Sequence, residues 1–460
     1  MKRQIIYLMC TTALLSSCHI YKSYDRPDVN VSGLYRDSAS VNDTLAVTDT
    51  INMGNMPWKE VFTDPKLQTL IEAGLENNTD LLTATLKVKE AEAMLTSAKL
   101  SFLPSFALNP QGTVSSFDHS KATQTYQLPI VSSWEIDMFG KLLNAERGKK
   151  AMLLQSKAYQ QAVRTKVIAN IANTYYTLLM LDRQLDISLQ TAESWKQSVE
   201  TTKGLVSIGV TNESGVASTE ANYYSVLASL PELRRQIRET ENSLSLLLGQ
   251  VPQTVDRGKL EEQKLPDHLA TGIPIQLLSN RPDVMQSELA LAAAYYTTNQ
   301  ARSAFYPNLT LTGTLGWTNS SGLGIVNPGK MIASAVGSLT QPLFNKGANI
   351  ANLRVAKAQQ KEALLNFQYQ LLNAGSEVSN ALVLYQSSTE RSNLEENQVK
   401  SLEKAVNYTQ QLFKLGSSTS YLEVLTAQKS LLSAQLSKVS DDFYRMQAVV
   451  NLYYALGGGR

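Results

Sequence analysis

Two stretches of the chain change the period of their hydrophobic pattern part-way along. From Asp283 to Ala304 the apolar residues recur at helical spacing, and from Pro307 onward apolar and polar residues alternate. The first pattern predicts a helix with one buried face, and the second predicts a strand with one apolar and one polar face. A similar helix begins at Asp80 and gives way to an alternating run after Pro104. A helix that leads directly into an amphipathic strand is therefore a repeated feature.

The two copies of this feature are separated by a constant interval. Asp80 and Asp283 mark the helix starts, Pro104 and Pro307 mark the changes of period, and the two pairs have the same separation in the sequence. A constant interval of this size indicates duplication of a large unit rather than a solenoid of short repeats. The sequence therefore predicts an internal two-fold repeat.

Each repeat contains a predicted β-hairpin, over about residues 102–138 in the first copy and about 306–344 in the second. In the first hairpin, the turn falls at Phe117–Ser120, and the following strand alternates from Tyr126 to Met138. The last strand, over 331–344, has small residues on both faces, so the pattern leaves its register open. We expect four amphipathic strands in the chain.

Long helical stretches without proline follow each hairpin, and each is followed by a return helix: 141–208 with 215–248, and 348–415 with 421–456. The long stretches end at Gly209 and Gly416. Apolar residues recur at three- and four-residue spacing along these helices, which is typical of antiparallel coiled coils. Pro231 lies inside the first return helix and is expected to kink or interrupt it. The fold class is thus mainly α, with a small amphipathic β portion.

These patterns divide the chain into a signal, a linker and two repeats. Residues 19–63 are polar and irregular, as expected of a linker that wraps the body. The predicted segments are a lipoprotein signal peptide (1–17), a lipid-anchored linker (18–63), the first repeat (64–250, with long helices over 141–248), a second linker (251–274) and the second repeat (275–460, with long helices over 348–456).

The N-terminus has the features of an export signal. Lys2 and Arg3 precede an apolar run that ends in Leu15-Ser16-Ser17-Cys18. This tetrapeptide resembles the bacterial lipobox, in which the cysteine is acylated and becomes the first residue of the mature chain. Cys18 is therefore the predicted lipidation site, and an ordinary secretory peptide with an incidental cysteine is the alternative. His19 after the cysteine is expected for retention in the outer rather than the inner membrane.

Composition narrows the function classes. Lysine and arginine total 42 against 40 aspartate and glutamate, so there is no basic excess that would suggest nucleic-acid binding. Beyond the signal, no apolar run reaches the length of about 18 residues that a spanning helix requires. If the chain crosses a membrane, it must do so with strands.

Four strands cannot form a closed barrel, and open sheet edges are prohibitive in lipid. The smallest spanning barrels have about eight strands, so the chain must share a barrel with copies of itself. Two copies would give eight strands and a filled lumen, and three would give twelve strands and an open bore. The hydrophobic pattern does not choose between them.

Several short motifs, taken together, resemble the TolC family, and in particular its lipoprotein branch, the outer-membrane factors of resistance-nodulation-division (RND) efflux pumps. The similarity extends from about Trp58 to the C-terminus. The motifs are Arg281-Pro282-Asp283-Val284, Glu288-Leu289, Ala304-Phe305-Tyr306-Pro307, Leu311-Thr312-Gly313, Ser133-Trp134-Glu135-Ile136-Asp137-Met138-Phe139-Gly140 and the lipobox Cys18.

This resemblance implies a homotrimer with a shared twelve-strand barrel in the outer membrane and a long α-helical barrel that crosses the periplasm. It implies that Pro104 and Pro307 are the junctions between the two barrels. It also implies two partners besides membrane lipid: an inner-membrane RND-type transporter and a periplasmic adaptor (membrane fusion) protein. Substrates such as drugs and other small molecules would leave passively through the duct, whose selectivity would reside mostly in the inner-membrane pump.

The resemblance also implies where the duct closes and where the adaptor docks. Leu422, Glu423 and Thr426 match positions that form apolar or acidic constriction rings at the periplasmic end in relatives. Thr426 stands where relatives often carry aspartate, so one acidic ring rather than two is expected here. The adaptor would dock at the two helix tips, Gly209-Val210-Thr211 and Gly416-Ser417-Ser418. Alternatively, Glu423 is a solvated helix residue, and the glycines serve only as helix C-caps.

Catalytic chemistry is not indicated. His19, His119 and His268 lie in unrelated contexts, and no histidine-based dyad, metal cluster or cofactor-binding motif is evident, so no cofactor and no metal are expected. Two other functions remain open: the outer-membrane duct of a type I protein secretion system, and a non-conducting structural lipoprotein. The second would not need strands with a lipid-facing apolar stripe.

Overall fold

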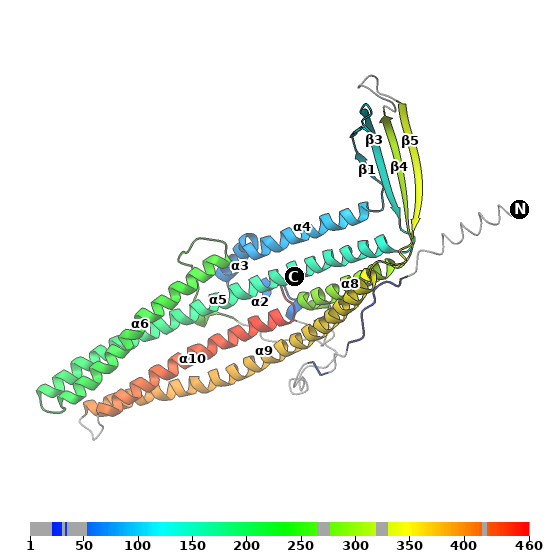
Figure 1. Cartoon of the computed structure of the whole chain (residues 1–460). Coiled ribbons are helices and arrows are strands. Elements are labelled where there is room, and N and C mark those ends of the chain that lie inside the picture. The colour runs from blue at the N-terminus through cyan, green and yellow to red at the C-terminus, as the bar shows by residue number, and fades with distance from the viewer. Residues whose placement is uncertain are drawn as a thin grey trace. The chain divides into compact units, whose positions relative to one another are not determined.

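The computed structural model describes residues 21–29, 33–34, 53–264, 266, 277–318, 330–415 and 421–459 (Figure 1). Within them, long helices dominate and the strands form a single sheet. The elements in chain order are η2 (Met53–Asn55), α2 (Trp58–Val61), α3 (Pro65–Asn77), α4 (Thr79–Leu100), β1 (Ser105–Leu108), β2 (Gln111–Ser115), β3 (Thr123–Ile136), α5 (Lys141–Ser207), α6 (Glu213–Leu247), η3 (Leu260–Glu262), α7 (Leu277–Asn280), α8 (Pro282–Ser303), β4 (Asn308–Thr318), β5 (Lys330–Thr340), α9 (Ala348–Lys414) and α10 (Tyr421–Ala455).

The chain divides into two compact units, each assembled from separate segments. Unit 1 comprises Met1–Val29, Leu86–Lys157 and Gln286–Tyr369, and unit 2 comprises Asn30–Thr85, Ala158–Met285 and Gln370–Arg460. Unit 1 contains the sheet and the helix segments next to it, and unit 2 contains the two helix returns, α6 and α10. Each unit therefore draws on both halves of the sequence.

The sheet is antiparallel throughout, with the order β1-β3-β4-β5, and β2 also pairs with β3. The first hairpin turns at Phe117–Ser120, where the Ser120 N–H donates to the Phe117 carbonyl at 2.9 Å. Asp118 and His119 have φ of 49° and 57°. Two left-handed residues in succession define a type I′ turn, whose twist matches that of the flanking strands.

The described residues contain five strands, so the prediction of four was wrong in one respect. The first predicted strand is divided into β1 and β2 by Asn109-Pro110. Proline has no N–H to donate, so it cannot continue the ladder. The register to β3 is the same on both sides of Pro110, with Leu108 opposite Ile130 and Gln111 opposite Gln127. The two strands therefore lie end to end as one arm of the hairpin.

The register brings the apolar positions of all strands onto one face of the sheet. Leu128 lies opposite Trp317, Ile130 opposite Leu315, and Trp134 opposite Leu311. Directly opposed residues point to the same side of a sheet. Most of this face is open, with exposed fractions of 71% for Phe106, 62% for Leu108, 55% for Leu315, 48% for Trp317 and 70% for Met331. The last strand, β5, ends at Thr340 rather than at Phe344.

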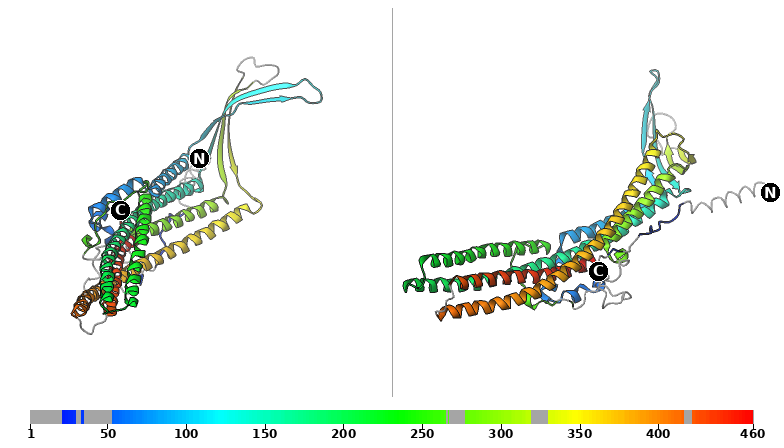
Figure 2. Two further views of the ribbon diagram at one scale, coloured as in Figure 1. Left: turned by 90° about the vertical axis from the view of Figure 1, so that its left-hand side faces the viewer. Right: turned by 90° about the horizontal axis from the view of Figure 1, so that it is seen from below.

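The long helices form antiparallel pairs, in which α6 runs back along α5 and α10 runs back along α9 (Figures 1 and 2). α5 ends in a Schellman motif, in which Val210 N–H donates to the Leu205 carbonyl at 3.0 Å and Gly209 has φ of 74°. α6 is continuous through Pro231, so of the expected kink or interruption the structure excludes the interruption. Pro231 lies on the exposed side of α6, where water can bond the carbonyl that the ring leaves unpaired.

The core of unit 2 lies where α3, α5 and α10 pack together. Tyr453 of α10 is buried there, and its ring packs edge-on against that of Phe62, with the ring centres 5.7 Å apart. The Tyr453 hydroxyl donates to the Met56 carbonyl and accepts from the Gly459 N–H, both at 2.8 Å. One buried tyrosine therefore ties the end of α10 to the segment before α2. The surrounding buried residues include Leu67, Ile71, Ile168, Ile171, Leu178, Val450 and Leu452.

In unit 1, an extended N-terminal segment packs along α8. Arg26 donates two hydrogen bonds to the Glu288 carboxylate, at 2.7 and 2.6 Å. Tyr24 packs edge-on against Tyr295 at 5.9 Å, and its N–H donates to the Tyr296 hydroxyl at 3.2 Å. These contacts fix the segment from Tyr24 to Arg26 to the helix.

Across the described residues, no helix is both long enough and apolar enough to span a bilayer. The same residues contain no group of three or more histidine, cysteine, aspartate or glutamate side chains arranged to hold a metal ion.

Candidate functional site

Three predicted constriction residues share one face of α10 in its first two turns. Leu422, Glu423 and Thr426 are exposed, whereas the intervening Val424 and Leu425 are 3% and 5% exposed. Thr426 donates its hydroxyl to the Leu422 carbonyl at 2.8 Å within the helix. Glu423 lies in the first turn, where the positive end of the helix dipole favours a negative charge. The structure therefore groups these three side chains on an exposed face.

The opposite face of α10 is fastened to α5 by polar contacts. The Tyr421 hydroxyl donates to the Ser198 carbonyl at 2.9 Å. Gln428, which is 7% exposed, lies 3.4 Å from the Ser198 hydroxyl and 3.5 Å from that of Ser194. Next to them, Trp195 of α5 is buried against Val226 and Leu425. These contacts hold the start of α10 in a fixed orientation, with Glu423 facing outward.

The tip between α5 and α6 exposes apolar residues. Ile208 and Val210 are 71% and 62% exposed, and Gly209 between them caps α5. Thr211 is partly buried, and the Asn212 side chain caps α6 by accepting from the Gly215 N–H at 3.2 Å. The other predicted docking tip, Gly416, Ser417 and Ser418, lies outside the described residues, as does Cys18.

At each junction between helix and strand, a side chain from later in the chain donates to a carbonyl in the turn that follows the helix. Pro104 lies between α4 and β1, and Trp134 Nε1 donates to the nearby Phe102 carbonyl at 2.8 Å. Pro307 lies between α8 and β4, and Gln341 donates to the Phe305 carbonyl at 3.0 Å. Carbonyls at a helix C-terminus have no partner within the helix, so these bonds stabilise the change from helix to strand.

Comparison with known proteins agrees with this architecture. The family described as "Outer membrane efflux protein" matches residues 70–250 and 273–458, which is most of the chain. The chain belongs to this family. It is therefore an outer-membrane protein of the efflux class, as the resemblance to TolC proteins predicts. The family match falls in two segments that coincide closely with the two predicted repeats.

Individual relatives cover almost the whole length. The cation efflux system protein CusC of Escherichia coli K12 is 30% identical over 459 residues, covering 98% of each chain. The probable outer membrane lipoprotein SilC of Salmonella typhimurium is 29% identical over 460 residues, covering 98% of this chain and 97% of SilC. The open-state crystal structure of the Neisseria gonorrhoeae MtrE outer membrane channel superposes with a TM-score of 0.85 and 26% identity, covering 96% and 98% of the two chains.

The family motif at the start of α8 forms a buried ionic junction. Arg281 is 2% exposed, and its Nε donates to Asp283 at 2.9 Å. Its Nη1 donates to Glu377 of α9 and to the Ala455 carbonyl at the end of α10, and its Nη2 donates to Asp283. Burial lowers the pKa of Arg281, but the two carboxylates outweigh it, so the net shift is upward and the guanidinium stays charged. Arg281 therefore connects three helices of unit 2.

A second buried charge cluster, between α9 and α10, was not anticipated. Asp441 is 1% exposed, and its Oδ2 lies 3.1 Å from Arg391 Nε. Burial, and after it the neighbouring Asp441 carboxylate, raises the pKa of Glu395 from 4.5 to about 7. The adjacent Asp442 is already paired, with Lys438 Nζ at 2.8 Å. Among the described residues, Arg391 is the cation that both Glu395 and Asp441 contact, so two acids share one positive charge and Glu395 retains a proton up to about neutral pH.

Sequence reasoning missed both clusters for different reasons. The Arg281 motif was recognised as a family signature, but its partner Glu377 lies far away in the sequence and has no distinguishing pattern. One feature of the sequence could have indicated the pair formed by Glu395 and Asp441, because Asp441-Asp442 interrupts the apolar spacing of α10. Two adjacent acids on a buried helix indicate that at least one of them needs a partner.

We predict that Arg281→Met destabilises the protein, because it leaves the Asp283 and Glu377 carboxylates without their cation. Breaking such a pair costs roughly 3 kcal/mol. Thermal unfolding of the detergent-purified protein, followed by circular dichroism, should show a lowered midpoint. The matched control is Arg235→Met, which removes an exposed arginine with two carboxylate partners and should change the midpoint little. Equal midpoints for the two variants would contradict the structural role of Arg281.

We predict that stability falls as pH rises from about 4.5 to about 7, because folded Glu395 retains a proton that the unfolded chain loses at its ordinary pKa. The raised pKa of Glu395 therefore contributes fully to stability below about pH 4.5. This contribution is lost as the pH rises to about 7. Glu395→Gln cannot ionise and should flatten this part of the profile. The neighbouring Glu396→Gln is the control, since Glu396 is exposed and pairs with Lys400. If the pH dependence of stability in this window were unchanged in Glu395→Gln, it would have to come from groups other than Glu395.

Proposed function

We propose that the chain is one subunit of a homotrimeric exit duct of a tripartite efflux pump, through which drugs or other small molecules pass passively to the exterior. The observation that carries the proposal is the open apolar face of the sheet. Soluble proteins rarely leave so large a contiguous apolar surface in water, and such a surface marks a contact with lipid or protein. A lipid-facing apolar face with a polar face behind it is the pattern of a transmembrane β-barrel.

The sheet of one chain has two free edges, which argues for assembly. Among the described residues, β3 and β4 are paired on both sides, while β5 and the arm formed by β1 and β2 are paired on one side. Unpaired backbone groups in hydrocarbon are prohibitive, so the edges must meet those of other copies. The arms number four per chain, and three copies would supply twelve, enough for a barrel with an open bore.

Internal duplication explains how one chain supplies two hairpins. The helices of the two halves have equal lengths, 22 residues for α4 and α8, 67 for α5 and α9, and 35 for α6 and α10. The carbonyl caps also correspond: Trp134 bonds to Phe102 in the first half, and Gln341 bonds to Phe305 in the second. We infer that a duplicated unit of helix, hairpin and helix pair gives the trimer a pseudo-sixfold arrangement.

Lipidation of Cys18 is consistent with the position of the N-terminal segment. Tyr21 lies next to Gly140, at the start of α5, close to the end of β3. Three residues span at most about 10 Å, so a lipid on Cys18 would enter the membrane close to the helix–strand junction. We propose this junction, at Pro104 and Pro307, as the level of the membrane surface, with the helices extending into the periplasm. The relative SilC is a probable outer membrane lipoprotein, which supports the same anchor.

We propose that the start of α10 forms the periplasmic constriction, with three copies of Glu423 around the axis. Leu422 and Thr426 would line the same ring. Three carboxylates in a narrow pore attract cations and repel one another, which makes the ring both selective and easy to open. The exposed apolar residues beside Gly209, at the tip of α5 and α6, are the proposed docking surface for the periplasmic adaptor, which links the duct to an inner-membrane transporter. The turn containing Gly416 would provide the second docking tip.

The proposed function is tested by electrical recording. The full-length protein, purified in detergent and inserted into planar lipid bilayers, should produce discrete conductance steps of uniform size. A non-conducting structural lipoprotein would insert without such steps. Absence of steps from protein whose trimeric state has been verified by light scattering would refute the channel.

The gate makes a separate prediction. Glu423→Ala removes the acidic ring, so the preference for cations in bilayer recordings should fall and the conductance should rise or become less variable. Glu213→Ala is the matched control, because Glu213 is an exposed acid in the first turn of α6, at the other tip. Unchanged conductance, ion selectivity and drug leakage in Glu423→Ala would eliminate the acidic ring as a gate.

A further inference from the structure

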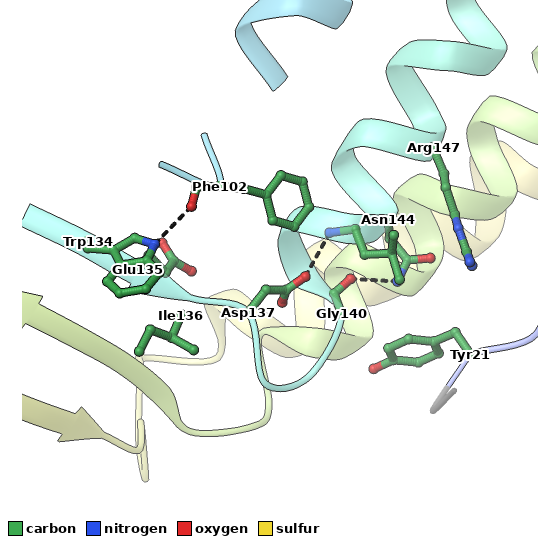
Figure 3. A pocket seen from close by; sticks show the side chains of 10 residues that line it. Tyr21, Phe102, Trp134, Glu135, Ile136, Asp137, Gly140, Asn144 and Arg147 are labelled. Atoms are coloured by element: carbon green, nitrogen blue, oxygen red, sulfur yellow. Dashed lines mark hydrogen bonds between the residues drawn. The ribbon is translucent and has the colours of Figure 1, made fainter. Parts of the chain in front are cut away.

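A cavity of about 270 Å³ lies in unit 1, where the end of β3 leads into α5 (Figure 3). It is bounded by the segment after α4, by the end of β3, by the first two turns of α5 and by Tyr21 from the N-terminal segment. One part of its wall is apolar, formed by Phe102, Trp134, Ile136 and Leu143. The remaining wall is polar, so the cavity is amphipathic.

Three polar groups at this cavity have no partner in the described part of the chain. Asn144 is 1% exposed, and its Nδ2 donates to the Gly140 carbonyl at 2.6 Å, so the orphaned atom is the acceptor Oδ1. The Tyr21 hydroxyl is buried and also unbonded. The half-buried Arg147 guanidinium makes no hydrogen bond or ion pair with a described residue. Buried polar groups are nearly always satisfied in proteins, so two orphaned buried atoms, on Asn144 and Tyr21, in a cavity that an unpaired Arg147 also lines favour a ligand at this cavity.

The two carboxylates of the wall limit the charge of that ligand. Glu135 is already neutralised by Lys141 Nζ at 2.8 Å. Asp137 accepts the Leu143 N–H at 2.7 Å through Oδ2, and its other oxygen stays available. A doubly charged phosphate monoester would be repelled by these groups, whereas a phosphodiester with one negative charge can pair with Arg147 alone.

The free donors and acceptors fall into two sets. Arg147 and the Tyr21 hydroxyl are donors that suit a phosphate oxygen, since burial raises the pKa of Tyr21 and keeps its proton in place. Asn144 Oδ1 and the free Asp137 oxygen are acceptors that suit an N–H donor, and the negative charge of the Asp137 carboxylate favours a donor with positive charge. One kind of molecule that would satisfy both sets carries a phosphodiester and a primary ammonium on an apolar body.

We propose that this cavity binds the headgroup of a zwitterionic phospholipid with a primary ammonium, such as phosphatidylethanolamine. The phosphate lies against Arg147 and Tyr21, the ammonium against Asn144 and Asp137, and the glycerol region along Trp134 and Phe102. The inference rests on the proposed function in one respect, since that function puts the helix–strand junction at the membrane surface where such lipids are present. The bound lipid joins the N-terminal segment to α5.

The test is native mass spectrometry of the full-length, delipidated protein in detergent, titrated with phosphatidylethanolamine. We expect saturable binding of one lipid per chain. Phosphatidylcholine, whose ammonium has no N–H, should bind at least about tenfold more weakly, because Asn144 and Asp137 stay unsatisfied. Inorganic phosphate at equal concentration should not displace the lipid. Equal affinity for the two lipids, or displacement by phosphate, would overturn the assignment.

Variants identify the site. Arg147→Gln should weaken phosphatidylethanolamine binding by about tenfold or more, and Arg147→Lys should recover part of it, because the charge returns without the planar fork. Lys150→Gln is the matched control, one turn further along the same face of the N-terminal part of α5, exposed and outside the cavity. Arg147 has no described partner, so its replacement should leave thermal unfolding unchanged. Equal losses in Arg147→Gln and Lys150→Gln would overturn the site.

The two proposals fail independently. Protein that forms conductance steps but does not prefer the ethanolamine lipid would refute this site and leave the duct standing. Protein that binds the lipid selectively but never conducts would refute the duct and leave the site standing.

Discussion

Every backbone N–H and C=O in a sheet needs a hydrogen-bond partner, and in hydrocarbon water cannot supply one. The sheet of this chain meets the requirement in its interior strands and leaves it unmet at β5 and along the arm of β1 and β2. Its apolar face is equally incomplete, since Phe106, Leu108 and Met331 are largely exposed. The proposed trimer accounts for both features. Neighbouring subunits would pair with the free strand edges, and lipid would cover the apolar face.

The same requirement governs the helix–strand junctions. The turn after each helix leaves a carbonyl that no helical N–H can reach, at Phe102 and at Phe305. Trp134 and Gln341, from the next part of the chain, donate to these two carbonyls. Both caps are donated by the hairpin or by its exit, so each junction is complete only when the hairpin has folded. The cavity at the start of α5 lies beside the first of these caps and shares Trp134 with it. Lipid binding there would therefore stabilise the junction as well as the N-terminal segment.

Charges are distributed according to their role. Arg281 is buried with two carboxylates and an α10 carbonyl, an arrangement that fixes three helices in one geometry. The Arg391, Glu395 and Asp441 cluster has more acid than base and holds a proton instead. Glu423 is the opposite case, an acid kept exposed on α10 while Tyr421 and Gln428 anchor the other face. An exposed acid on a rigid helix suits a constriction ring, whereas the buried groups suit structure.

Sequence periodicity determined a great deal about this protein. It determined the long helices, the hairpins and their apolar face, because each depends on the spacing of neighbouring residues along the chain. Periodicity was less reliable in predicting the effect of single prolines. Pro110 divides a predicted strand in two, whereas Pro231 lies at an exposed position of α6 and does not interrupt the helix. Only the tertiary structure brought Glu377 to Arg281, Asp441 to Glu395, and Tyr21 to Asn144 and Arg147. These groupings join residues that are remote in sequence, and pairing between remote residues is decided by packing, which has no local period.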